Sequence, residues 1–163
     1  MKGLAMAGKR NALIGLSAAA LVAIAWSEGY REHAYDDGVG VQTIGFGTTS
    51  GVKPGDKTTP ERALGLLYRD ASEMVAQLSR PGCIGDVPVY QHEADAFVSL
   101  AYNIGSGAFC KSTLVKRLKQ TPPDYAGACS EILRWNKAGG RVLPGLKKRR
   151  QQEYELCMQG DSK

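Results

Sequence analysis

Six glycines between Glu28 and Gly51 place the tightest limit on how this 163-residue chain can fold. Glycine is unfavourable inside a helix, but it enters the positive-φ conformations of tight turns at little cost. Apolar side chains recur between these glycines, at Val39, Val41, Ile44 and Phe46. The pattern predicts short hairpin strands and glycine-rich turns over residues 36–51. Residues 28–35, just before them, are predicted to be the end of a helix.

Beyond the hairpin, apolar residues recur at three- and four-residue steps, which is typical of amphipathic helices. Thr58-Thr59-Pro60-Glu61 has the features of a helix start, with a capping hydroxyl, an early proline and a glutamate three residues after Thr58. The predicted helices cover residues 58–79, 90–103, 112–119, 124–135 and 146–158. No linker divides them. We therefore predict a single-domain α+β fold, mainly helical, with a small β-hairpin region near the N-terminus.

The N-terminal part contains an uncharged run, residues 12–26, directly after Lys9-Arg10. A basic region followed by an apolar region is the layout of an export signal. The run has 15 residues, whereas a spanning helix needs about 20, and its alanines contribute little to insertion. Insertion into a bilayer would therefore be only marginally stable.

Three interpretations of this run remain open. It is a signal peptide cleaved after Ala23-Ile24-Ala25, a buried helix of a soluble protein, or a segment that inserts weakly and later leaves the membrane. Cleavage would leave Glu28 close to a frayed chain end, which is a poor support for a catalytic acid. In the third case the same apolar residues lie first in lipid and later against the folded domain.

The formal net charge of +5 would draw the protein to anionic polymers such as nucleic acid, anionic lipid or an acidic cell wall. Much of this charge lies in the run 147–150, for which a solvated helix face is the simplest interpretation. The run lacks the interleaved aromatic residues of nucleic-acid binders, so we predict no nucleic-acid partner. His33 and His92 have no partners at metal-ligand spacing, and we predict no metal and no cofactor.

The four cysteines are widely spaced and form no C-x-x-C pair, which argues against a zinc ribbon or a thioredoxin-like motif. With an export-like N-terminus, an even number of cysteines predicts two disulfides in an oxidising compartment. Four free thiols in a cytosolic protein are the alternative. Four cysteines allow three pairings, and the sequence by itself does not choose among them.

The stretch from Glu28 to Gly51 also contains the elements of glycoside hydrolysis, which normally uses two carboxyl groups on opposite sides of the scissile bond. Glu28 follows apolar residues at a helix end, which suits a protonated acid, and Asp37 opens a wet, glycine-rich turn, which suits an ionised partner. Thr43, on a later strand, is placed to hold a water near Asp37. Taken alone the signal is weak, because Asp-Asp-Gly is a good turn sequence in any protein.

Several motifs in order strengthen this interpretation. Glu28-Gly29, Tyr35, Asp37, Thr43-Ile44-Gly45 and Gly47 resemble the signature of the phage-type lysozymes, glycoside hydrolase family 24. In that family an aspartate follows the glutamate after nine residues and a threonine after fifteen, and both spacings are present. The resemblance continues through Ala101-Tyr102-Asn103-Ile104-Gly105, Ser112-Thr113-Leu114, Arg134-Trp135 and Gly145-Leu146 with the basic run and Glu153, and it covers roughly residues 22–158.

The resemblance implies a lysozyme-like fold and specific roles in the site. Glu28 would protonate the glycosidic oxygen, Asp37 would assist water or stabilise the positive sugar ring, and Thr43 would position that water. Inversion of configuration is implied, with carboxyls roughly 6.5–9.5 Å apart. Asn103 would line the cleft or cap its helix. One of Lys148, Arg149 and Arg150 would approach the catalytic glutamate, Glu28.

Likeness to similar endolysins also implies the disulfides Cys83–Cys110 and Cys129–Cys157. The implied substrate is peptidoglycan, cut at the β-1,4 bond between N-acetylmuramic acid and N-acetylglucosamine to lyse a bacterial host. The alternative is a catalytically silent lysozyme-like protein that binds peptidoglycan or acts as a scaffold.

The N-terminal run resembles that of signal-anchor-release endolysins. Residues 1–27 would form the anchor and residues 28–163 the lysozyme domain, with the catalytic helix continuous with the anchor. We expect export by the host secretion machinery, contact of residues 12–26 with the inner membrane, and later release into the periplasm as a monomer.

Overall fold

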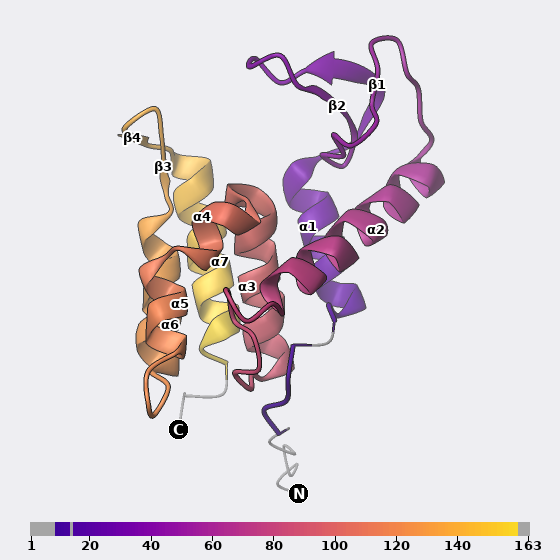
Figure 1. Cartoon of the computed structure of the whole chain (residues 1–163). Coiled ribbons are helices and arrows are strands. Elements are labelled where there is room, and N and C mark those ends of the chain that lie inside the picture. The colour runs from indigo at the N-terminus through magenta and orange to yellow at the C-terminus, as the bar shows by residue number, and fades with distance from the viewer. Residues whose placement is uncertain (1–8, 14, 160–163) are drawn as a thin grey trace, which may run out of the picture. The chain divides into compact units, whose positions relative to one another are not determined.

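The computed structural model describes residues 9–13 and 15–159, and these fall into two compact units. One unit is Leu16–Glu73. The other combines the described parts of Met1–Gly15 and Met74–Lys163. Helix α2 (Pro60–Leu78), labelled in Figure 1, contains the boundary between the units, which falls between Glu73 and Met74. Residues 1–8 and 14 of the predicted anchor lie outside the described residues.

The unit Leu16–Glu73 begins with helix α1 (Ala18–Glu28), whose first turn is capped by the Ser17 hydroxyl accepting a hydrogen bond from the Ala20 N–H at 3.1 Å. The helix ends at Glu28 because Gly29 adopts a φ of 72°, a conformation that favours glycine. The predicted helix end over residues 28–35 is therefore wrong. Only its first residue is helical, and strand β1 (Arg31–Asp36) follows.

Strand β1 pairs antiparallel with β2 (Gln42–Gly45), with Tyr35 opposite Thr43, so the predicted hairpin is confirmed. A bridge between Ile44 and Thr48 folds the chain back after β2. The other edge of β1 is also paired, since the Thr58 N–H donates to the Glu32 carbonyl at 2.9 Å. These backbone hydrogen bonds on both sides hold β1 in place.

Helix α2 starts two residues after the predicted position and ends close to the predicted stop. Its buried face includes Ala63 and Leu67. Gly45, with a φ of 65°, lies so close to this face that a Cβ there would be 2.8 Å from the Cβ of Ala63. Two small residues therefore allow the end of β2 to approach α2.

The other unit is helical. It contains α3 (Gln91–Ile104), α4 (Ser106–Cys110), α5 (Thr113–Leu118), α6 (Tyr125–Glu131), a 3₁₀ helix (Ile132–Arg134), the short strands β3 (Lys137–Ala138) and β4 (Arg141–Val142), and α7 (Pro144–Cys157). Helix α3 packs along α7. The core between the helices consists of fully buried apolar side chains, among them Phe97, Leu100, Phe109, Leu114, Leu118 and Ile132.

The helices from α3 onward match the predicted ones except in two places. Gly105, with a φ of 87°, ends α3 as predicted, but it also precedes the short helix α4, which the sequence analysis missed. The predicted helix over 124–135 divides into α6 and the 3₁₀ helix. Disulfides join Cys83 to Cys110 and Cys129 to Cys157, which is the pairing that the resemblance implies.

The described residues of 9–15 are bound to the helical unit. Asn11 and Val89 form an antiparallel bridge with backbone hydrogen bonds of 2.9 and 2.8 Å. Leu13 is buried, and its carbonyl accepts a hydrogen bond from the Ser79 hydroxyl at 2.9 Å. The carbonyl of Gly15 accepts one from the side chain of Gln91 at 3.2 Å.

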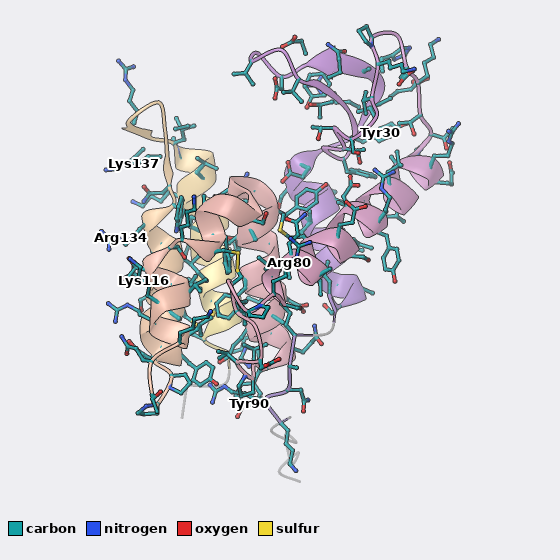
Figure 2. The ribbon with its side chains drawn as sticks, viewed as in Figure 1. Tyr30, Arg80, Tyr90, Lys116, Arg134 and Lys137 are labelled. Atoms are coloured by element: carbon teal, nitrogen blue, oxygen red, sulfur yellow. A yellow bond between two sulfur atoms is a disulfide. The ribbon has the colours of Figure 1, made fainter. Side chains whose placement is uncertain are left out.

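Arg10 adds an ion pair to this attachment. Its guanidinium donates two hydrogen bonds, of 3.2 and 2.9 Å, to the carboxylate of Glu93, whose side chain is only 1% exposed. The same guanidinium lies 4.2 Å from the ring centre of Tyr90, labelled in Figure 2, and 3.6 Å from that of Tyr125. No helix among the described residues is both long and apolar enough to cross a bilayer.

Candidate active site

Glu28 is the last residue of α1 and is half-buried. The turn after β2 lies against its side chain, because a Cβ built on Gly47 would be 3.6 Å from the Oε2 atom of Glu28. Gly47 has a φ of 94°, a backbone conformation that favours glycine, and a Cβ there would be in van der Waals contact with the glutamate. The predicted acid thus sits on a rigid helix end and is flanked by the hairpin.

Tyr30 helps to fix this turn. Its ring lies 5.5 Å from that of Phe46, between centres, and its hydroxyl donates a 3.0 Å hydrogen bond to the carbonyl of Thr58 (Figure 2). Phe46 is the residue between Gly45 and Gly47. The start of β1, the turn beside Glu28 and the start of α2 are therefore held together by one side chain.

Asp37 stands at the opposite end of the hairpin, just after β1, and is exposed. Its Oδ1 atom accepts hydrogen bonds from the backbone N–H groups of Val39, at 3.0 Å, and Val41, at 3.2 Å. Within the described residues, its Oδ2 atom accepts no hydrogen bond. The loop therefore orients the carboxylate through one oxygen and leaves the other open to a solvent molecule.

Asp36 explains why this loop closes. Its Oδ1 atom accepts hydrogen bonds from the N–H groups of Gly38, at 2.7 Å, and Gly40, at 3.1 Å. Both glycines have positive φ, 94° and 83°. The nine-residue spacing from Glu28 leads to Asp37 rather than Asp36, and the structure gives Asp36 its own set of hydrogen bonds within the turn. The signal for this role was the Asp-Asp-Gly sequence itself.

Thr43 lies in β2 and is 5% exposed. Its hydroxyl is 3.4 Å from the Val41 carbonyl, which is also the carbonyl that accepts the Asp37 N–H at 3.1 Å. The threonine hydroxyl and the aspartate therefore share a backbone neighbour at the hairpin end. All three predicted catalytic residues belong to the unit Leu16–Glu73.

Asn103 belongs to the helical unit, near the end of α3, and is exposed. Its Oδ1 atom accepts a 2.9 Å hydrogen bond from Arg150. Because the oxygen of the amide is used in this way, the side-chain NH₂ group is the part left to donate to a ligand. The structure thus gives Asn103 a fixed orientation.

Arg150 is fully buried, although the run 147–150 was interpreted as a solvated face. That interpretation is wrong for this residue, whose Nε atom lies 2.7 Å from Glu153 Oε2. The carboxylate of Glu153 also accepts a 2.7 Å hydrogen bond from the Ser99 hydroxyl. The available signal was the three-residue spacing of Arg150 and Glu153, which puts opposite charges on one helix face.

Burial raises the pKa of Glu153, while Arg150, the Ser99 hydroxyl and Arg149 act in the opposite direction. The buried guanidinium nonetheless needs a charged partner, because an isolated buried cation is very costly. This pair therefore anchors α7 to α3 and supports Asn103. In the part of the chain that the structure describes, no group of three or more His, Cys, Asp or Glu side chains is placed to hold a metal ion.

Comparison with known proteins identifies similar chains. The model of the family described as phage lysozyme matches residues 25–153. An endolysin of Acyrthosiphon pisum secondary endosymbiont phage 1 is 41% identical over 145 residues, which cover 86% of this chain and 96% of the relative. A SAR-endolysin of bacteriophage PS34 is 36% identical over 134 residues, covering 82% of this chain and 77% of the relative.

A solved structure has the same fold over most of the chain. The endolysin from Escherichia coli O157:H7 phage FAHEc1 superposes with a TM-score of 0.76 at 35% sequence identity, and the match covers 91% of this chain and 96% of that one.

Proposed function

The chain belongs to the phage lysozyme family, and on this premise we propose that it is an endolysin that cuts the glycan strands of peptidoglycan. The bond cleaved is the β-1,4 linkage between N-acetylmuramic acid and N-acetylglucosamine. One observation carries the proposal: a single hairpin holds Asp37 and Thr43 at one end, while the turn at its other end packs on Glu28. The names of the relatives, endolysin and SAR-endolysin, support a lytic role.

In the proposed mechanism Glu28 donates its proton to the glycosidic oxygen as the bond to the sugar C1 carbon breaks. A water molecule held by Thr43 attacks C1 from the opposite face, and Asp37 takes up the proton that this water loses. Each turnover leaves Glu28 ionised and Asp37 protonated, and exchange with solvent restores both. Attack from the opposite face inverts the configuration at C1.

Asn103 is proposed to bind the substrate. Its NH₂ group suits the carbonyl oxygens of N-acetyl groups, and the buried Arg150 holds the amide in that orientation. A catalytically silent scaffold is not favoured, because a scaffold has no use for the three catalytic side chains. Neither a metal nor a cofactor takes part in the proposed reaction.

We also propose a membrane-bound state before the folded one. Residues 1–27 act as the signal-anchor and residues 28–163 as the lysozyme domain. If residues 12–26 crossed the inner membrane, Arg10 and Glu28 would lie on opposite sides of it, and Arg10 would be unable to bind Glu93. The contacts of residues 9–13 and 15 with the helical unit therefore fit the released form.

In this scheme the host secretion machinery inserts the chain with its domain on the periplasmic face. Release then delivers a monomer to the periplasm, where the peptidoglycan lies. The SAR-endolysin relatives support this order of events.

Product analysis tests the proposed cleavage. Purified peptidoglycan is digested, reduced with borohydride and analysed by mass spectrometry. New muramitol ends are expected, whereas glucosaminitol ends or no new ends would contradict the proposal. Proton NMR of early products reports the anomer, and an α-anomer formed first supports inversion.

Cell fractionation with carbonate extraction tests the proposed release. The chain is expected to resist extraction from the membranes of energised host cells and to become extractable after the membrane potential is collapsed, with no change in mass. A loss of mass on release would indicate cleavage. It would exclude the proposal that residues 12–26 lie first in the membrane and later against the folded domain.

A further inference from the structure

Helix α1, labelled in Figure 1, has uncharged, exposed side chains along one face. Trp26 is 89% exposed and Val22 is 63% exposed. Ala18, Ala19 and Ala23 are exposed beside them. With 3.6 residues per turn, these five residues fall within an arc of about 140°. We call them the α1 strip.

The strip faces away from the side chain of Glu28. Trp26 and Glu28 are two positions apart, which places their side chains about 200° apart around the helix. Glu28 lies on the side of α1 that also carries the buried residues Ile24 and Ala25, and it contacts the turn at Gly47. Trp26 therefore does not form a sugar-stacking wall beside the catalytic carboxylate.

A solvent-exposed tryptophan at the centre of an uncharged strip indicates a binding surface. Tryptophan prefers the boundary between water and lipid, because its ring is apolar while its N–H remains hydrated. The sequence has no charged residue from Asn11 to Ser27 to oppose such contact, and the net charge of +5 attracts anionic lipid.

A second copy of the chain fits the strip less well. One tryptophan offers roughly 150–250 Å², and Val22 and three alanines add little. A specific protein interface normally buries about 800 Å² on each partner. Shallow insertion into a lipid surface has no such requirement, because a single aromatic side chain can enter the headgroup region.

We propose that the folded, released protein binds the surface of an anionic phospholipid membrane through the α1 strip, with Trp26 as the inserted side chain. The inference builds on the proposed release, since the lipid would be the membrane that residues 12–26 have left. The opposite orientation of Glu28 then keeps the catalytic carboxylate turned away from the lipid. The surface-bound enzyme is thereby held near the membrane.

Co-sedimentation with vesicles tests this inference. The full-length soluble protein is mixed with vesicles of phosphatidylethanolamine and phosphatidylglycerol, or of phosphatidylcholine alone. Trp26→Ser is expected to reduce the partition coefficient on the anionic vesicles at least about tenfold. Tyr68→Ser is the matched control, since Tyr68 is a 65% exposed aromatic on α2, and it should bind like the wild type.

Fluorescence identifies the inserted residue. The chain has two tryptophans, so Trp135→Phe leaves Trp26 as the reporter. A blue shift of its emission on anionic vesicles, with quenching by brominated lipid, is expected. An unchanged emission overturns the proposal. So does a shift seen with chitooligosaccharides but not with vesicles, or a concentration-dependent dimer that Trp26→Ser abolishes.

The two proposals fail in different ways. Digestion of purified peptidoglycan without membranes measures the proposed activity, and Trp26→Ser should keep the wild-type rate there. Lipid binding without any digestion of peptidoglycan would contradict the proposed function but not the proposed lipid binding by the α1 strip. Digestion together with equal lipid binding by wild type and Trp26→Ser would contradict only the proposed lipid binding by the α1 strip.

Discussion

Arg10 supplies the ion pair that attaches residues 9–13 and 15 to the helical unit, and its contribution can be measured. Replacing Arg10 with methionine keeps an apolar stem but removes both hydrogen bonds to the buried carboxylate of Glu93. Within the described part of the chain, the carboxylate then keeps the Tyr90 N–H, at 2.7 Å, as its remaining hydrogen-bond donor. A buried charge without its counter-ion is strongly destabilising.

The size of the loss follows from the burial of the two partners. Breaking a fully buried ion pair costs about 3–5 kcal/mol. Glu93 is 1% exposed but Arg10 is 26% exposed, so water screens part of the interaction. We therefore expect Arg10→Met to lower the free energy of unfolding by about 2–4 kcal/mol. The lost contacts with the two tyrosine rings are part of this figure.

Urea denaturation measures the change, with Lys9→Met as the control because Lys9 is an exposed neighbour of equal charge. The control should stay within about 0.5 kcal/mol of the wild type. Amide exchange at Asn11 and Val89 should also become faster in Arg10→Met, because their bridge opens. The double variant with Glu93→Gln should lose less than the sum of the single losses. Equal stabilities of Arg10→Met and Lys9→Met would refute the reasoning.

Three further predictions concern single residues. Gly45→Ala should destabilise the fold by about 2–5 kcal/mol in urea, since it combines positive φ with a 2.8 Å contact to Ala63, and a change below about 1 kcal/mol would contradict the close approach. Gly47→Ala should lower kcat by roughly tenfold or more, because relief of the strain at a φ of 94° would shift the turn that contacts Glu28. Gly51→Ala, with similar backbone strain and open space around it, should not, and equal rates would count against the contact. The Gly127 N–H, and then Arg117, lower the pKa of Asp124 in the folded protein. The Asp124 charge therefore stabilises the fold at pH values above its ordinary pKa of 3.8. That stabilisation is lost as the pH falls through the lower pKa of the folded state. The Tm difference between wild type and Asp124→Asn should therefore shrink in acid, and a difference independent of pH would argue against this origin.

The hairpin and most helices could be predicted because their signals are local. Glycine spacing defines the turns around Asp37, and the helix starts at Pro60 and Thr113 have capping side chains beside them. The helix was predicted to continue past Glu28 although the uncharged run ends at Trp26, and the decisive feature is the positive φ of Gly29. Helix α4 was missed because its five residues begin directly after Gly105 and include Gly107.

The contacts between distant segments were beyond the sequence analysis. Nothing local in Arg10 predicts that it meets Glu93, which is 83 residues away. Arg150 looked like one charge among four, and only the packing of α7 on α3 shows that it is buried. In the candidate site, the residue types and their spacing were available from the sequence. The approach of Gly47 to Glu28 and the separate hydrogen bonds of Asp36 and Asp37 required coordinates.

The central claim is that Glu28 supplies the proton for glycosidic cleavage, and a turbidity assay on chloroform-treated Gram-negative cells tests it most directly. Glu28→Gln removes the proton and keeps the shape of the side chain, while Glu32→Gln, on the exposed face of β1, makes the same chemical change elsewhere. Both variants should keep the wild-type Tm to within a few degrees. We predict that Glu32→Gln clears the cells at the wild-type rate and that Glu28→Gln clears them at least about a hundredfold more slowly. Clearing by a folded Glu28→Gln at the wild-type rate would contradict the account.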